Sequence, residues 1–371
     1  MDRIACLVSM PSMMRTHHFS NEQKVKLILW LLLFSVLAGC AAPGSIVTPS
    51  ASSTAPATST ATITPSLAPT STPVPTKTPL PCGRSSPLFI LLVGSDSRQD
   101  TYKIGLSDSM RVIRFDFDEP RVQVMTFPRD LYVEIPEIED HYGITHGKLN
   151  QAYLYGNPGY DYYDGPGRGP GLLSLTLEQN FGSRVDRYMA VNIQTFVRII
   201  DELGGIDVDL PYEIDGRVKR SKDPDRYFAP GKQHLDGYRT MLLARLRPHG
   251  DFQRLEIQNL ILQAVAEKLL SPSAVLKLPV LFRDFKNSVQ TDLGPLEIGE
   301  LLCLRTKLDP QNIAYGSFPE NIFKLGRVHD PVLGNTSILQ VDFKILRSYV
   351  DRFNQGDWPR IQEGPKGILD P

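Results

Sequence analysis

Three short apolar runs within residues 89–130 constrain the fold more than any other stretch of the sequence. Residues 89–93, 110–117 and 122–127 are rich in Ile, Val and Phe and are short enough to be strands. A polar loop joins the first two, and the tight turn Asp118-Glu119-Pro120 joins the last two. If the strands are antiparallel, one sheet edge collects three polar clusters: Asp96 with Arg98, Ser107 with Asp108, and Arg129 with Asp130. Carboxylates and guanidiniums gathered at one end of a hydrophobic sheet predict a functional site.

The composition describes an ordinary globular protein and excludes a global electrostatic attraction to nucleic acid. Of the 371 residues, 41% are hydrophobic and 9% aromatic. Forty basic side chains against 41 acidic ones give a formal net charge of −1, so we expect no nucleic-acid partner and only a local anion site. Four cysteines without a CxxC pair argue against a zinc site.

The N-terminal segment has the pattern of an export signal. Basic residues precede an apolar run at 27–37, which is shorter than the about 20 residues that span a bilayer. The tetrad Leu37-Ala38-Gly39-Cys40 resembles a bacterial lipobox, so residues 1–40 are interpreted as a lipoprotein-type signal peptide with Cys40 as the lipidation site. The alternative is an uncleaved N-terminal anchor. Both interpretations place the rest of the chain outside the cytoplasm, on the outer face of the bacterial cell membrane.

A linker precedes the folded part. Residues 41–84 are dominated by Ala, Ser, Thr and Pro, which cannot bury enough apolar area to fold, and they predict a semi-extended tether. We expect one folded domain at 85–355 and a loosely ordered tail at 356–371. Cys82, at the end of the tether, could pair with Cys303, or Cys303 could be a free buried thiol.

Local patterns predict several elements of the domain. Residues 172–181 have the pattern of a helix closed by Gly182, and 187–191 that of a strand. Asn192 is placed to cap a helix at 193–203 that ends at Gly204-Gly205, and 206–210 alternates like a half-exposed strand. Asp251 is placed as the N-cap of a helix that reaches about residue 270.

A second polar cluster lies near the start of that last helix. It consists of Arg245, Arg247, Arg254 and Gln258, and the last two are four residues apart on one helix face. Each motif alone is more typical of a turn or a solvated face. Together with the first cluster, the arginines suit phosphate oxygens, and Asp96 and Asp108 suit Mg²⁺ with substrate phosphate as a further ligand.

The order of these motifs resembles the LytR–CpsA–Psr (LCP) family of cell-envelope phosphotransferases. The segments that carry the resemblance are 91–98 (LLVGSDSR), 106–108 (LSD), 127–130 (FPRD), 148–153 (KLNQAY), 203–206 (LGGI), 235–237 (LDG), 250–254 (GDFQR) and 291–293 (TDL). The resemblance implies an α/β fold: a single three-layer α/β/α domain with a central, largely antiparallel sheet. It also implies binding of polyprenyl (pyro)phosphate, with the lipid tail in an apolar cavity and the head group at an arginine-rich mouth.

The resemblance assigns roles to individual residues. Asp96 and Asp108 would hold Mg²⁺, and Asp96, Asp108 and Arg129 would be catalytic. Contacts to the phosphates would come from Arg98, Arg129, Lys148, Arg245, Arg247, Arg254 and Gln258. The chain departs from the family where Ile257-Gln258-Asn259 replaces the usual Arg-Gln-Gln, so one arginine is absent. It also lacks the usual tyrosine before Arg245.

The function implied is Mg²⁺-dependent transfer of a glycopolymer from a polyprenyl-pyrophosphate carrier to a cell-wall sugar hydroxyl. The partners would be the polyprenyl-pyrophosphate-linked glycopolymer, a peptidoglycan or other envelope glycan acceptor, and the membrane through the lipid anchor. Two alternatives remain: a polyprenyl-pyrophosphate hydrolase, and a non-catalytic polyprenyl-phosphate-binding or regulatory envelope protein.

Overall fold

The structure is a computed structural model that describes residues 81–98, 101–217, 223–247, 250–275, 277–285 and 287–360. The predicted signal segment with Cys40, and all of the predicted tether except its last residues, lie outside this range. Lipidation and tethering therefore stay predictions.

A six-stranded mixed sheet forms the centre of the domain, in the order β11-β6-β1-β2-β3-β12. β1 pairs antiparallel with β2, β2 with β3, and β6 with β11, whereas β1–β6 and β3–β12 are parallel. The three strands predicted in 89–130 are present, and the largely antiparallel sheet is confirmed. The strand bounds are β1 Leu88–Ser95, β2 Ser107–Asp116, β3 Arg121–Phe127, β6 Arg187–Asn192, β11 Val289–Thr291 and β12 Ile313–Ser317.

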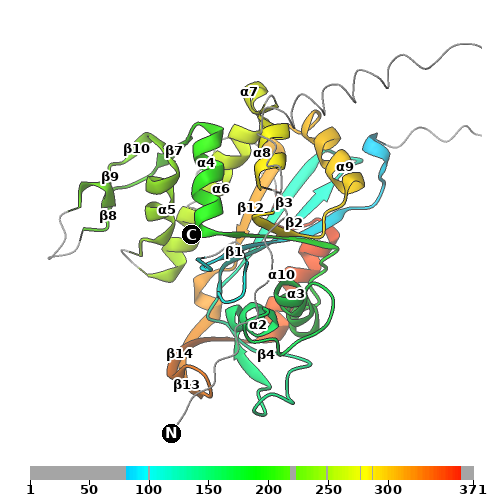
Figure 1. Cartoon of the computed structure of the whole chain (residues 1–371), viewed down its shortest axis with the longest axis vertical. Coiled ribbons are helices and arrows are strands. Elements are labelled where there is room, and N and C mark those ends of the chain that lie inside the picture. Colours follow the sequence, from blue (N-terminus) through cyan, green and yellow to red (C-terminus); the bar gives the residue numbers. More distant parts are fainter. Residues whose placement is uncertain are drawn as a thin grey trace, which may run out of the picture. The chain divides into compact units, whose positions relative to one another are not determined.

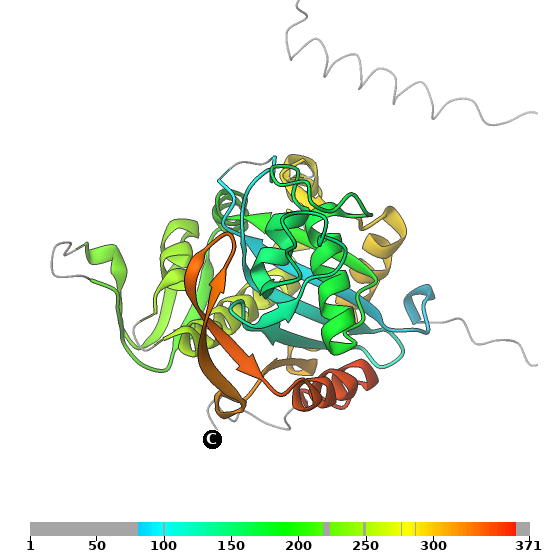
Figure 2. The ribbon, with the colours of Figure 1, turned by 90° about the horizontal axis from the view of Figure 1, so that it is seen from below.

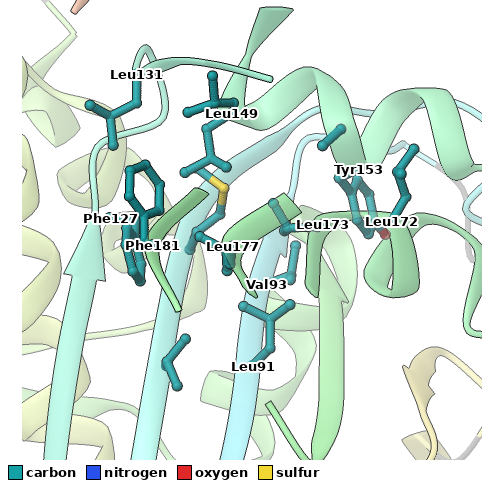
Figure 3. Packing of buried hydrophobic residues seen from close by; sticks show 14 of the residues in the cluster. Leu91, Val93, Phe127, Leu131, Leu149, Tyr153, Leu172, Leu173, Leu177 and Phe181 are labelled. Atoms are coloured by element: carbon teal, nitrogen blue, oxygen red, sulfur yellow. The ribbon is translucent and has the colours of Figure 1, made fainter. Parts of the chain in front are cut away.

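Helices cover both faces of the sheet, which gives the predicted three layers (Figure 1). Side chains alternate along the strands: Leu91 and Val93 pack toward α2 and α3, whereas Leu88 and Ile90 point to the opposite face, where Leu304 of α9 packs. Figure 3 shows the first of these interfaces, where Phe127 stacks on Phe181 of α3. The bounds are α2 Leu149–Gly156, α3 Arg168–Phe181 and α10 Phe343–Gln355 on one face, and α6 Asp251–Leu270 and α9 Pro295–Arg305 on the other.

A smaller unit with its own core projects to one side of the sheet (Figures 1 and 2). Its helices are α4, Ile193–Leu203, and α5, Gly237–Arg245, and its strands are β7, Ile206–Leu210, β10, Gly231–Leu235, and the short pair β8, Ile214–Asp215, and β9, Tyr227–Phe228. Oδ1 of Asn192 accepts a hydrogen bond from Thr195 N at 2.8 Å, so the predicted cap is confirmed. The predicted bounds of α4 and β7 are confirmed as well.

Two hairpins complete the surroundings of the predicted site. β4, Tyr132–Glu134, pairs with β5, His146–Lys148, and β13, Phe323–Asp330, pairs with β14, Gly334–Val341. A bridge between Leu131 and Leu339 joins β14 to the segment that follows β3. Figure 2 shows the β13–β14 hairpin in orange. The short helices α7, Pro272–Val275, and α8, Leu278–Phe285, follow α6. Among the described residues, no helix is long and apolar enough to cross a membrane.

The structure decides or corrects four details. Cys82 and Cys303 form a disulfide with a Cα–Cα distance of 5.5 Å, which decides between the two alternatives. α3 begins at Arg168, four residues earlier than predicted. Gly250 is the N-cap of α6, because the carboxylate of Asp251 pairs with arginines instead.

The fourth detail concerns the predicted loose tail. Its first five residues, 356–360, pack onto the domain: Gln123 donates hydrogen bonds to the carbonyls of Gly356 and Pro359, and Trp358 stacks on Phe318. These residues are thus part of the folded domain. Residues 361–371 lie outside the described range.

Candidate functional site

The ends of β1, β2 and β3 meet at one sheet edge, as the sequence predicts. A bulge at Gly94 and Ser95 lets the chain leave β1, and Asp96 then pairs with the segment that enters β2. Asp96 N donates to Leu106 O at 3.1 Å, and Leu106 N donates to Asp96 Oδ1 at 2.7 Å. These bonds fix Asp96 beside the start of β2, which carries Asp108.

An ion-pair chain crosses this edge. Arg129 donates from Nη1 to Asp108 Oδ1 at 2.5 Å and from Nε to Asp130 Oδ2 at 3.2 Å. Lys148, the last residue of β5, donates from Nζ to the other oxygen of Asp130 at 2.8 Å. Asp130 therefore holds both cations in place, a larger role than the sequence indicated.

The pKa directions follow from burial and from these neighbours. Burial raises the pKa of Asp96, and the nearby Asp108 raises it further, whereas the bond from Leu106 N and the charges of Arg245 and Arg129 oppose the rise. Burial would also raise the pKa of Asp130, but the bonds and charges of Lys148 and Arg129 outweigh it and lower that pKa. The surroundings of Asp96 and Asp130 thus shift the two pKa values in opposite directions.

α6 adds a second group of charges to the same place. Arg254 is 2% exposed and donates from Nη1 to the carbonyl of Asp108 at 3.1 Å. Oδ1 of Asp251 lies 3.3 Å from Nε of both Arg254 and Arg247. A cavity of about 10 Å³, room for roughly one water, lies between these residues and the end of β3. We call the following set the sheet-edge site: Asp96, Asp108, Arg129, Asp130, Lys148, Arg247, Asp251 and Arg254.

Three predicted residues lie differently. Arg245, at the end of α5, is exposed, and its charge lowers the pKa of Asp96, so it faces the site. Arg98 is exposed and forms no ion pair within the described chain. Gln258 is turned away: its Nε2 donates to Ala244 O at 3.1 Å, and its Oε1 accepts from Arg111 at 3.4 Å. The structure does not place Gln258 among the ion-paired side chains.

Sequence reasoning missed two contributors. The sequence indicates Asp251 as an N-cap and as part of the 250–254 motif, without a role at the site, and it places Arg111 within an apolar strand. Arg111 is 4% exposed and bonds Asn259 and Gln258 of α6. The arginine inside the run Met110-Arg111-Val112-Ile113 is a usable signal, because arginine is rarely fully buried unless its charge is paired.

The residues fit a divalent cation of the magnesium type. Asp96 and Asp108 lie close enough for one carboxylate to raise the pKa of the other, which a cation between them would relieve. Among the described residues, Oδ1 of the buried Asn150 has no hydrogen-bond partner, and the backbone N of Asn150 donates to the carbonyl of Arg129. In the described part of the chain, no three His, Cys, Asp or Glu side chains form a metal group. Mg²⁺ is commonly held by one or two carboxylates together with substrate phosphate and water.

Comparison with known sequences gives one family. The profile of the LytR_cpsA_psr family matches residues 56–352. TagV of Bacillus subtilis (strain 168), named a polyisoprenyl-teichoic acid–peptidoglycan teichoic acid transferase, is 28% identical over 216 residues, 57% of this chain and 51% of its own. MsrR of Staphylococcus aureus (strain COL), named a regulatory protein, is 29% identical over 229 residues, 60% of this chain and 63% of its own. The chain thus spans between half and two thirds of these relatives.

Solved structures share the fold. The crystal structure of B. subtilis TagV aligns with a TM-score of 0.55 and 23% identity, and covers 74% of this chain and 100% of that one. A structure described as TagT bound to LIIa-WTA aligns with a TM-score of 0.54 and 20% identity, and covers 73% of this chain and 90% of that one. At these identities the likeness concerns the architecture.

Proposed function

Because the chain belongs to the LytR_cpsA_psr family, we propose that it transfers a glycopolymer from a polyprenyl-pyrophosphate carrier to a sugar hydroxyl of the cell wall. The observation that carries the proposal is the sheet-edge site, where Asp96, Asp108 and Arg129 lie beside the buried Arg254. The name of TagV, a transferase of teichoic acid to peptidoglycan, supports the same class of reaction.

The cationic side chains would bind the pyrophosphate. Arginine presents planar donor forks that match phosphate oxygens and stays charged at any working pH. Arg254 and Arg129 are fixed by the Asp108 backbone and by carboxylates, so little ordering is needed when the anion arrives. Arg245, Arg247 and Arg98 are exposed and can close on the outer phosphate oxygens.

Asp96 and Asp108 would hold the metal. When bound, Mg²⁺ neutralises charge on the phosphate oxygens during transfer. Oδ1 of Asp108 also accepts from Arg129, so one carboxylate holds the arginine next to the phosphates.

The transfer is a displacement at phosphorus. The acceptor hydroxyl oxygen forms a bond to the phosphorus that carries the glycopolymer, and the bond from that phosphorus to the bridging oxygen breaks. Polyprenyl phosphate leaves with the electron pair, and the hydroxyl proton passes to Asp96 or Asp108. Arg129, fixed between Asp108 and Asp130, stabilises the charge that develops on the phosphate oxygens.

The carrier lipid would reach this site at the membrane surface. We propose that Cys40 is lipidated and that residues 41–84 tether the domain to the outer face of the bacterial membrane. Radiolabelled fatty acid fed to cells tests this: label is expected in the chain and absent from a Cys40→Ala variant. Label that persists in the variant would contradict it.

The purified full chain tests the reaction. It is incubated with a polyprenyl-pyrophosphate-linked oligosaccharide, peptidoglycan fragments and Mg²⁺, and products are separated by mass. Peptidoglycan that carries the oligosaccharide through a phosphodiester supports transfer. Asp96→Asn and Arg129→Gln should each lower the rate by about 10³-fold or more, whereas Asp161→Asn, in an exposed ion pair with Arg168, should not.

A second candidate, a non-catalytic binding or regulatory protein, is favoured by the name of MsrR and by Ile257, which is buried where the family usually has arginine. Binding of the carrier without any product, in the presence of Mg²⁺ and acceptor, would establish it in place of the transferase. Water as acceptor, with free phosphorylated glycan as the product, would establish the hydrolase.

A further inference from the structure

Arg111 is a buried cation that the proposed reaction does not use. It lies in the middle of β2, opposite Leu92 of β1 and Thr126 of β3. Its side chain is on the face that α6 covers, and only 4% of the residue is exposed. Among the described residues, no carboxylate lies within ion-pair distance of it.

Neutral oxygens surround the guanidinium. Oδ1 of Asn259 accepts from Nε at 3.3 Å and from Nη2 at 3.2 Å, and Oε1 of Gln258 accepts from Nη2 at 3.4 Å. Ser109 Oγ accepts from Nη1. These bonds engage all three nitrogens of Arg111, but they leave its positive charge uncompensated.

The charged side chain that affects Arg111 most is another cation, Arg254. Burial lowers the pKa of Arg111 to about 10, and the charge of Arg254 contributes to that shift. Arg254 is itself 2% exposed, and the ion-pair partner that it has within the described part of the chain, Asp251, also pairs with Arg247. Two buried guanidiniums with so little countercharge are costly unless an anion binds beside them.

Arg111 is also part of the attachment of α6 to the sheet. Asn259 accepts from Thr126 Oγ1 at 3.2 Å and donates to Ser317 Oγ at 3.0 Å, so one side chain ties α6 to β2, β3 and β12. Gln258, held by Arg111, donates to Ala244 O in α5. The network therefore fixes both helices from which Arg254 and Arg245 extend.

We propose that Arg111 is a positioning residue of the phosphate site, which orients α6 and α5 and whose charge is balanced by the bound pyrophosphate. The inference rests on the proposed phosphate chemistry of the sheet-edge site. It predicts a division of effects: the arginine is unfavourable for the ligand-free fold and favourable for anion binding.

The test separates these two effects in the full chain. Inorganic pyrophosphate is titrated by calorimetry, and Tm is measured without ligand, for the wild type, Arg111→Met and Arg111→Lys. We expect Arg111→Met to keep or raise Tm and to raise the Kd at least tenfold. Arg111→Lys, which keeps the charge, should recover part of the affinity.

A matched control lies in the same strand. Arg114 is also buried, but it pairs with Asp116 and donates to the carbonyl of Asn354, away from the site. Arg114→Met should lower Tm and leave the Kd unchanged. The inference is overturned if Arg111→Met lowers Tm as Arg114→Met does and leaves the Kd as in the wild type. A wild-type chain that binds no pyrophosphate would instead overturn the proposed function, and the inference with it.

Discussion

Replacing Asp130 with asparagine should separate the positioning of the site from its direct contacts with substrate. Asp130 is the carboxylate that Arg129 and Lys148 share, at 3.2 and 2.8 Å, and the three side chains are only 13–18% exposed. Asparagine has the same shape but no charge, and it can accept through one oxygen only. One cation therefore loses its bond to residue 130, and the other keeps a weaker one, while Arg129 retains its bond to Asp108.

The magnitude follows from these bonds. A hydrogen bond to a charged group contributes about 1.5–3 kcal/mol, so the loss of one and the weakening of another should cost about 2 kcal/mol of unfolding free energy. For a domain of this size that corresponds to a decrease of roughly 4 °C in Tm. A misplaced Arg129 should lower kcat by about 10²-fold, since displacements near 1 Å have effects of that size.

Thermal unfolding and the oligosaccharide-transfer assay measure the two quantities on the same preparations. Asp161→Asn serves as the control, because Asp161 pairs with Arg168 in an exposed position. The reasoning is refuted if Asp130→Asn matches that control in both Tm and kcat. A loss of Tm with unchanged kcat would show that Asp130 stabilises the fold without positioning Arg129.

Three further predictions follow from the same contacts. The folded-state pKa of Asp130 is lowered, so the stability that its ionised carboxylate contributes is complete above the unfolded pKa near 4 and is lost as the pH falls through the folded value. In urea unfolding between pH 5 and 2, the unfolding free energy of Asp130→Asn should therefore fall less steeply with decreasing pH than that of the wild type. Replacing both Cys82 and Cys303 with serine opens a loop of 221 residues and should cost about 2–5 kcal/mol, measured from urea midpoints, with no further change on adding reductant. Asn192→Ala removes the bond to Thr195 N and should cost about 1 kcal/mol, whereas Asn192→Asp should retain most of the stability.

Elements defined by neighbours in the sequence could be predicted from it. The alternation and turn in 89–130 specify β1, β2 and β3, and antiparallel pairing then brings Asp96, Asp108 and Arg129 to one edge. α4 was predictable for the same reason, because its N-cap Asn192 and its C-cap Gly204 directly adjoin the helix in the sequence.

Features that depend on distant segments were not predictable in the same way. The helical spacing of Arg254 and Gln258 was correct, yet Gln258 turns toward Ala244 because α5 packs there. The partner of Cys82 lies 221 residues away, and neither pattern nor spacing selects it. Arg111 could be assigned to a strand, but only the position of α6 shows that it is covered and what it contacts.

The positive charges of the site are local, so the overall composition of the chain does not indicate an anion-binding site. Across the whole sequence the formal charge is −1, close to neutral, and predicts nothing about anions beyond the need for a local site. At the site and beside it, the structure places more cations than carboxylates: Arg111, Arg129, Lys148, Arg245, Arg247 and Arg254 against Asp96, Asp108, Asp130 and Asp251. The excess of two positive charges matches in magnitude the charge of a pyrophosphate diester, and salt screens the charges of Arg111 and Arg254 least, because both side chains are buried. A chain without overall charge can thus hold a dianion at one sheet edge, because α6 brings arginines to strand ends that carry aspartates.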